Sequence, residues 1–421
     1  MVLHVHPTKN MLNTVQNQAL RLVLGAFRTS PAASIQVEAN ESPLDLRREK
    51  LSMQYALKLS SNKQNPMYSV VFHAKFKPLF EKKPSATPTF GIRILPILKS
   101  INVNMTHVHQ NSISPIPPWQ LKQPQIILDL CEYKKSSSNT DWFLSSFNNV
   151  KTRHADYVHI YTDGSKEREK TGAAIVVQDH IIQNRLYDKS SVFSAEMKAI
   201  FLAFQYIAQS SLLKFLIFSD SLSLLQALDN SKTENPLIRL AIEEYTHLVD
   251  ANKTVIFCWV PSHIGIEGNE KADNAAKLAL GLEITDFKIP HSDFKIYITQ
   301  HTHNKWQNSW NLLTTNKLHE IRPLLDVLQI SKLHTRKDEV VLCRARIGHT
   351  HLTHAYLLKN EPRPECSICQ QPLTVRHCLF ECQKYLSHRP LFPMHSANEL
   401  LAKYPNIIIK FLKETGIYNL F

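Results

Sequence analysis

The order of strand-like and helix-like segments between residues 155 and 283 constrains the fold more than any other feature of this chain. Alternating or continuously apolar runs of about six residues are typical of strands, and apolar residues spaced three and four apart are typical of helices. In chain order the pattern predicts strands at 157–163, 173–178 and 181–187, a helix at 194–209, a strand at 214–220, helices at 221–228 and 236–252, a strand at 254–260 and a helix from about 269 to 280. This order predicts a mixed α/β domain.

Four acidic residues stand at the ends of these segments. Asp163 and Asp220 end two of the predicted strands, Glu196 lies in the first turn of a helix, and Asp273 lies in the last helix beside a run of alanines. Parallel strands end at one edge of a sheet, and the small alanines allow the helix to approach, so we expect the four carboxylates to converge. Their mutual repulsion would be relieved by hard divalent cations such as Mg²⁺ or Mn²⁺.

Each acid also has an ordinary structural explanation. Asp163 precedes a glycine and fits a turn, Asp220 fits the N-cap of the helix that follows it, and Glu196 is favourable near a helix N-terminus. Only the combination of the four favours a metal site.

The motifs around these acids resemble a known family. YTDGSK, SAEMKAI, FSDSLSLLQAL and WVPSHIGIEGNEKADNAAK resemble, in this order, the motif set of type 1 ribonuclease H, and within it the domain of non-LTR (jockey-like) retrotransposon polyproteins, over about 125 residues. The resemblance implies a five-stranded mixed sheet flanked by helices. It also implies two-metal hydrolysis of the RNA strand of RNA–DNA hybrids, with 5′-phosphate and 3′-hydroxyl products.

The resemblance also implies roles for individual residues. Asp163 would bridge two Mg²⁺ or Mn²⁺ ions, Asp273 would hold the ion that activates water, and Glu196 and Asp220 would hold the ion that stabilises the leaving oxygen. His263, in the loop ten residues before Asp273, would assist proton transfer or product release. A merely solvated loop histidine is the alternative.

Charge is unevenly distributed along the chain. The formal net charge is +13, yet residues 155–283 carry 17 acidic and 12 basic residues, so their net charge is −5 and the rest of the chain carries +18. Many cellular enzymes of the family that the motifs resemble insert a basic substrate-binding helix between the two central helices, and we expect none here, because only DNSKTEN separates them. We therefore expect weak hybrid binding by the domain alone, with salt-dependent contacts from basic flanks.

Asn269 and Glu270 are further candidates for site residues, which would orient the His263 loop or nearby waters.

A second metal site is predicted near the C-terminus. Cys366, Cys369, His377 and Cys382 form C-x2-C-x7-H-x4-C, a ligand set suited to tetrahedral Zn²⁺. Cys378 is a competing ligand, and reduced buried cysteines are the alternative. The odd count of 7 cysteines disfavours a disulfide framework.

The remaining segments complete the predicted organisation. We expect a helical segment at 1–60, a connection of low order at 61–150, the ribonuclease H domain at 151–283, a helical region at 284–360, a zinc module at 361–392 and a tail at 393–421. VQNQALRLVLGAFRTSP resembles the region that follows the polymerase palm in those polyproteins. The chain has no Asp-Asp pair, so we expect a carboxy-terminal piece without polymerase activity.

The predicted setting is intracellular, in the nucleus or cytoplasm. The polar start MVLHVHPTKN does not resemble a signal peptide, and no apolar run reaches the length of a membrane span. The predicted partners are an RNA–DNA hybrid, nucleic acid on the basic flanks and a separate reverse transcriptase. Two other hypotheses stay open: a catalytically inactive nucleic-acid-binding remnant of a mobile element, and a nuclease or integrase of the same fold, which the GNEKAD helix disfavours.

Overall fold

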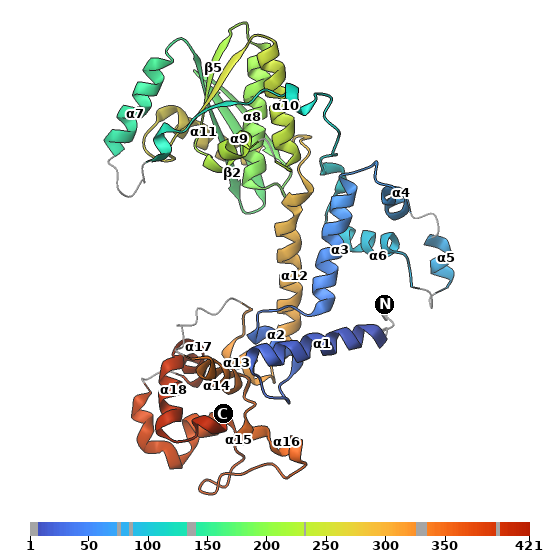
Figure 1. The fold of residues 1–421 in the computed structure, drawn as a ribbon, viewed down its shortest axis with the longest axis vertical. Helices are drawn as coiled ribbons and strands as arrows, with labels where there is room; N and C mark the ends of the chain where they lie inside the picture. Colours follow the sequence, from blue (N-terminus) through green and yellow to red (C-terminus); the bar gives the residue numbers. More distant parts are fainter. Residues whose placement is uncertain are drawn as a thin grey trace. The chain divides into compact units, whose positions relative to one another are not determined.

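The computed structural model divides the chain into two units (Figure 1). It describes residues 7–73, 77–83, 87–132, 140–230, 233–325, 335–392 and 396–421. One unit comprises Met1–Leu51 with Gln300–Phe421, and the other comprises Ser52–Thr299. The divisions fall within α3 (Leu44–Ser60) and α12 (Phe294–Asn311).

The unit of residues 52–299 is built on a mixed sheet of six strands in the order β1-β6-β5-β2-β3-β4. The strands are β1 (Gln125–Ile127), β2 (Val158–Glu167), β3 (Lys170–Val177), β4 (His180–Leu186), β5 (Lys214–Ser219) and β6 (Thr254–Trp259). β2, β3 and β4 pair antiparallel, whereas β1, β6, β5 and β2 pair parallel. All five predicted strands are present, so the predicted α/β class with a mixed sheet is confirmed. The predicted number of five strands was wrong, because β1 pairs with β6 and adds a sixth.

Helices cover both faces of this sheet (Figure 1). α8 (Val192–Gln209), α9 (Leu222–Asp229) and α10 (Pro236–Asp250) pack on the face that includes Ile160. α7 (Thr140–Arg153) and α11 (Glu267–Leu278) pack on the face that includes Tyr161. Neighbouring strand residues point to opposite faces, so Asp163, two positions after Tyr161, belongs to the α11 face.

The first strand does not end at Asp163, and that prediction was wrong. Parallel pairing of β2 with β5 stops at Thr162 and Ser219, but antiparallel pairing with β3 continues to Glu167. The Asp-Gly pair therefore lies inside a strand, at the point where β5 leaves it, and not in a turn. Asp163 and Asp220 are the next residues after the last parallel pair.

The prediction of low order at 61–150 was also wrong for the part of this region that the structure describes. It contains α4 (Met67–Phe72), α5 (Lys77–Lys82), α6 (Phe90–Ser100), α7 and β1. The apolar side chains of Ile94 and Leu98 are buried in a cluster with Met53 of α3 and Phe294 of α12. The proline-rich composition suggested that too little apolar surface would be buried here to offset the conformational entropy lost on folding. Burial of these side chains supplies the stabilisation that offsets this entropy cost.

The other unit is helical. Its helices are α1 (Pro7–Leu24), α2 (Ala32–Glu38), α13 (Lys317–Ile321), α14 (Arg336–Ile347), α15 (His351–His354), α16 (Tyr356–Lys359), α17 (Ala397–Lys403) and α18 (Pro405–Glu414), with parts of α3 and α12. Among the described residues of both units, the short helical segments are η1 (Met105–His107), η2 (Pro118–Gln120), η3 (Asp129–Glu132), η4 (Ala279–Gly281), η5 (His291–Asp293), η6 (His377–Glu381), η7 (Gln383–Leu391) and η8 (Tyr418–Leu420). Among the described residues, no helix combines the length and apolar character that crossing a membrane requires.

Gly164 sets the distance between β2 and α8. A Cβ built on Gly164 would lie 2.5 Å from the backbone nitrogen of Glu196 and 2.8 Å from the carbonyl carbon of Ala195. These contacts are to backbone, which cannot rotate away. The absence of a side chain at position 164 therefore lets the first turn of α8 lie directly on the strand that carries Asp163.

We expect Gly164→Ala to destabilise the protein by about 1–3 kcal/mol, because the added methyl group must displace α8. Gly281→Ala is the matched control, since a Cβ there meets nothing within 4 Å. Thermal or denaturant unfolding measures both. Equal stability of the two variants would contradict the close approach of α8 to β2.

Candidate active site and metal sites

Three of the four predicted carboxylates converge. One oxygen each of Asp163, Glu196 and Asp220 lies within 4.8 Å of the other two. Asp163 comes from β2, Asp220 directly follows β5, and Glu196 comes from the first turns of α8, which reaches this place because Gly164 has no side chain. Strand register and one glycine thus bring together residues that are 57 positions apart at most.

This cluster is electrostatically costly. Asp163 and Glu196 are each only 6% exposed. Burial raises the pKa of Asp163 to about 7, and the neighbouring charges of Asp220 and Asp273 add to the effect. Burial also raises the pKa of Glu196 well above its usual value and raises that of Asp220. Protons or cations must therefore compensate the negative charge near neutral pH.

The donor set fits a divalent metal ion. One carboxylate oxygen of Glu196, Oε2, is buried and has no hydrogen-bond partner among the described residues. A buried oxygen of this kind is expensive to leave unpaired. Since all three ligands are carboxylates, the cluster suits a hard cation such as Mg²⁺ or Mn²⁺.

Asp220 is fixed by two groups near it. Asn269 Nδ2 donates a hydrogen bond of 3.2 Å to Asp220 Oδ2, and Trp259 Nε1 donates one of 3.1 Å to the Asp220 carbonyl oxygen. The sequence suggested Asn269 as a residue that orients the loop or nearby waters, and it gave no indication of Trp259. Trp259 pairs with Ser219 at the end of β6, and that register places its indole beside residue 220.

Asp273 lies beside the cluster of three and not within it. It groups instead with His263 and Glu270, whose ligand atoms lie within 4.8 Å of its own. Asp273 Oδ2 also forms a 2.6 Å ion pair with Lys277 Nζ on the next turn of α11. Its charge nevertheless raises the pKa of Asp163 and Asp220, so it is near enough to act on them.

His263 lies in the loop before α11 and is largely exposed. Its backbone has a φ of 54°, in the left-handed region that favours glycine. The side chain is 63% exposed, and its Nδ1 lies 3.9 Å from Glu270 Oε2. A charge on His263 lowers the pKa of Asp220. The loop thus places an exposed titratable group beside the buried carboxylates.

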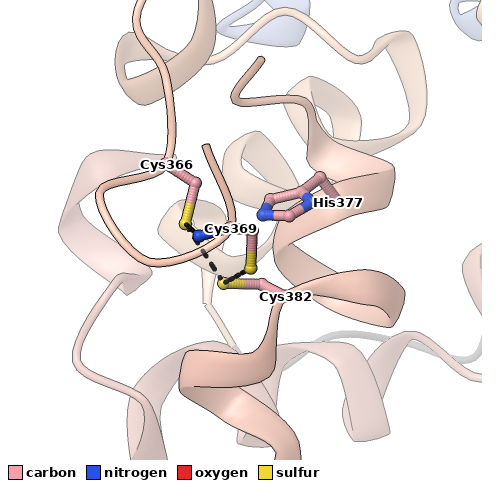
Figure 2. Close-up of side chains that lie close together, drawn as sticks. All are labelled: Cys366, Cys369, His377 and Cys382. Carbon is pink, nitrogen blue, oxygen red and sulfur yellow. Dashed lines mark hydrogen bonds between the residues drawn. The ribbon is translucent and has the colours of Figure 1, made fainter. Parts of the chain in front are cut away.

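The predicted zinc ligands also converge, as Figure 2 shows. One ligand atom from each of Cys366, Cys369, His377 and Cys382 lies within 4.8 Å of the others. Cys378 is not part of this group: it is 1% exposed and packs in an apolar cluster, and burial raises its pKa to about 12. The geometry therefore favours Cys366, Cys369 and Cys382 over Cys378 as the candidate ligands that accompany His377.

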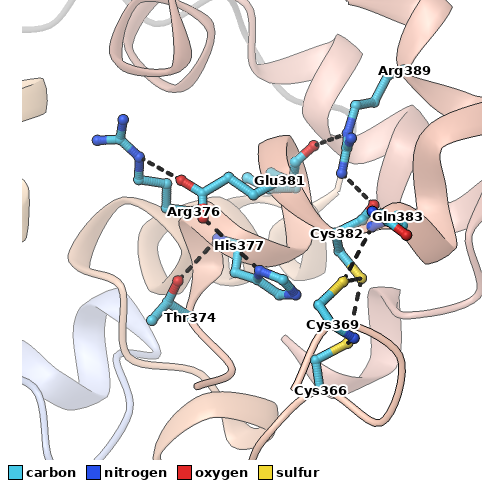
Figure 3. A network of polar contacts seen from close by, with 10 residues as sticks. Cys366, Cys369, Thr374, Arg376, His377, Glu381, Cys382, Gln383 and Arg389 are labelled. Carbon is cyan, nitrogen blue, oxygen red and sulfur yellow. Dashed lines mark hydrogen bonds and ion pairs between the residues drawn. The ribbon is translucent and has the colours of Figure 1, made fainter. Parts of the chain in front are cut away.

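The backbone around this group is arranged for sulfur and imidazole ligands (Figure 3). The amide of Cys369 lies 3.5 Å from Cys366 Sγ and is the largest influence lowering the pKa of that thiol to about 6. The Gln383 amide lies 3.5 Å from Cys369 Sγ, and the His377 amide donates to Thr374 Oγ1 at 2.9 Å. Amides that favour a thiolate suit a soft or borderline metal ion.

His377 itself lacks ordinary partners. It is 2% exposed, and neither ring nitrogen makes a regular hydrogen bond to another described residue. The nearest acid is Glu381, whose Oε2 lies 3.9 Å from His377 Nδ1 and which also accepts a 3.0 Å contact from Arg376 Nε. A buried imidazole with unused nitrogens beside three thiols fits a closed four-ligand Zn²⁺ site.

A protein-family model described as RNase H matches residues 155–280. The matched range contains β2 to β6, α8 to α11, and the site residues Asp163, Glu196, Asp220, His263, Glu270 and Asp273. The helical segments on either side and the Cys366–Cys382 group lie outside it. Sheet topology, the buried acidic triad and the family match agree, and residues 155–280 form an RNase H domain.

Proposed function

We propose that this protein hydrolyses the RNA strand of RNA–DNA hybrids and leaves 5′-phosphate and 3′-hydroxyl ends. The observation that carries the proposal is the buried triad of Asp163, Glu196 and Asp220 inside the RNase H domain. Three carboxylates with raised pKa values and a free buried oxygen form a site that is built to hold divalent cations.

The proposed division of roles follows the positions of the acids. Asp163 is central, Glu196 and Asp220 lie with it in the triad, and Asp273 lies beside it with His263. Asp163, Glu196, Asp220 and Asp273 would hold a pair of Mg²⁺ or Mn²⁺ ions, which would supply water activation and stabilisation of the leaving oxygen. Burial of Asp163 and Glu196 excludes bulk water, and Asn269 holds the Asp220 carboxylate in one orientation.

His263 is placed for proton exchange. Its side chain is 63% exposed to solvent, and its ligand nitrogen lies within 4.8 Å of carboxylate oxygens of Glu270 and Asp273. We assign it the transfer of a proton at the leaving group or during product release.

The basic part of the chain is proposed to hold the nucleic acid. Residues 52–154 carry 13 basic and 4 acidic residues, a net charge of +9, and belong to the same unit as the acidic domain. Phosphate contacts from lysine and arginine make affinity fall steeply with salt concentration. The sequence motifs also support a retrotransposon origin for the protein and a separate reverse transcriptase as its partner.

The Cys366–Cys382 group is proposed to bind one Zn²⁺ ion. The supporting observations are four converging ligands, a buried histidine without regular hydrogen bonds and amides directed at the thiols (Figures 2 and 3). Bound zinc would join the segment at Cys366 to the turn η6, whose own packing contributes Cys378 and Leu379 to the core.

We expect Asp163→Asn to reduce the rate of hybrid cleavage in Mg²⁺ by more than about a hundredfold. This loss is larger than the loss of activity usually seen when the changed residue only supports a metal ligand. The same variant should unfold at a higher temperature than wild type in EDTA, because it removes one of several repelling buried carboxylates. A labelled RNA–DNA hybrid and thermal unfolding measure the two effects.

Asp250→Asn, at an exposed position near the end of α10, is the control and should retain full cleavage. Cleavage by Asp163→Asn at the wild-type rate would reject the assignment of the triad. Absence of cleavage by the wild-type protein, with hybrid binding intact, would favour the alternative of an inactive nucleic-acid-binding remnant.

For zinc, we expect about one ion per chain after gentle purification and nearly none in Cys369→Ser. Cys378→Ala should keep its zinc, because the Cys378 side chain lies in the apolar cluster and outside the ligand group. Elemental analysis by mass spectrometry measures the metal content. If Cys378→Ala loses its zinc while Cys369→Ser keeps it, the assignment of the zinc ligands is refuted.

A further inference from the structure

A carboxylate outside the matched RNase H range contacts the helix that carries Glu196. Asp293, the last residue of η5, accepts a 2.8 Å hydrogen bond from the Ser191 amide on its Oδ2. Ser191 is the N-cap of α8, and its Oγ accepts the Ser194 amide at 3.1 Å. The family match ends at residue 280, so Asp293 belongs to the segment that follows the domain.

The residue before the N-cap, Ser190, is hydrogen-bonded to side chains of the sheet. The carbonyl oxygen of Ser190 accepts hydrogen bonds from Lys166 Nζ at 2.7 Å and from Thr171 Oγ1 at 3.2 Å. Lys166 lies on β2 three positions after Asp163, and Thr171 lies opposite it on β3. The Ser190–Ser191 peptide is therefore fixed on its carbonyl side by the sheet and on the following amide by Asp293.

Charge supports the same arrangement. Burial raises the pKa of Asp293, while the contact with Ser191 and the positive charge of Lys166 act to lower it. A carboxylate at a helix N-terminus also interacts favourably with the unpaired amides and the helix dipole there. Asp293 and Lys166 thus form two halves of one polar clamp on the start of α8.

The position of this helix start determines where Glu196 lies. Glu196 is five residues after the N-cap, within the first two turns of α8. A helix behaves as a stiff rod with a rise of about 1.5 Å per residue, so displacement of its first turn is passed on to Glu196. The triad tolerates little displacement, because its three oxygens lie within 4.8 Å and Gly164 leaves no space between α8 and β2.

We propose that Asp293 is a positioning residue for Glu196, so that the segment after the RNase H domain completes the metal site. The inference rests on the proposed function for its kinetic consequence, but its structural consequence concerns metal binding alone. Removal of the Asp293 carboxylate releases the Ser191 amide and lets the N-terminal turn of α8 move. Glu196 then no longer shares a cation with Asp163 and Asp220 in the same geometry.

Three variants of the full chain test this. Asp293→Ala removes the acceptor, Asp293→Asn keeps an oxygen that can accept the Ser191 amide, and Asp286→Ala removes an exposed acid of the same segment that pairs with Lys288. We expect Asp293→Ala to weaken Mn²⁺ binding, measured by calorimetry, by about tenfold, as is usual when a residue supporting a metal ligand is lost. Asp293→Asn should restore most of the affinity, and Asp286→Ala should match wild type.

Hybrid cleavage provides the second measurement. For Asp293→Ala we expect kcat to fall and the Mg²⁺ concentration for half-maximal rate to rise by a similar factor. We expect KM for the hybrid to stay within about twofold, since the proposed phosphate contacts lie on the basic residues 52–154. Unfolding temperatures of the three variants identify any loss of folded protein. If Asp293→Ala does not fold, Asp293→Asn decides: wild-type-like Mn²⁺ affinity supports the clamp, and loss of affinity in a folded protein overturns it.

Wild-type Mn²⁺ affinity in a folded Asp293→Ala variant overturns the inference, as does equal weakening by Asp286→Ala. Failure of the proposed function is a separate result. A wild-type protein that binds Mn²⁺ without cleaving hybrids rejects the function and leaves the comparison of Mn²⁺ affinities valid. A wild-type protein that binds no Mn²⁺ overturns both.

Discussion

The mutual repulsion of buried carboxylates governs the structure around the site. Asp163, Glu196 and Asp220 are brought together by a continuous strand, a helix start and a strand end. Such an arrangement costs stability, and it persists because the surrounding core is large and apolar. The same repulsion and burial raise the pKa of Asp163 to about 7, because a bound proton removes one of the negative charges. A divalent cation removes the cost by taking the place of those protons.

The structural unit is larger than the matched domain, and the sheet edges show why. β1 pairs with the outer edge of β6, which would otherwise present unpaired backbone groups. At the opposite edge, Ile284 forms a bridge with Arg185 of β4, and the Thr285 amide donates to the Arg185 carbonyl oxygen at 2.9 Å. Residues outside 155–280 thus pair with both outer strands of the matched domain, β6 and β4. The flanking segments therefore contribute backbone pairing to the sheet as well as basic side chains to the chain.

The sequence predicted the elements with strong periodicity and missed those defined by their neighbours. The strands and helices of the domain follow from apolar spacing, and their observed ends differ from the predicted ones by a few residues. The Asp163-Gly164 pair looked like a turn because its local chemistry is that of a turn, whereas its actual role depends on α8, which begins 28 positions later. β1 has three residues and is defined by its pairing with β6, so no local pattern could identify it. Cys378 could be separated from the other cysteines only when its burial in the core was known.

Asp273 lies outside the triad and is paired with a lysine. Lys277 compensates the negative charge of Asp273 through a 2.6 Å ion pair on α11. The Lys277 charge also lowers the pKa of Asp163, so a single lysine moderates both the triad and its neighbour. Sequence spacing could place Asp273 near the rim of the sheet, because the alanines of α11 permit close packing. It could not show that a lysine one turn further along the helix would hold that carboxylate to one side.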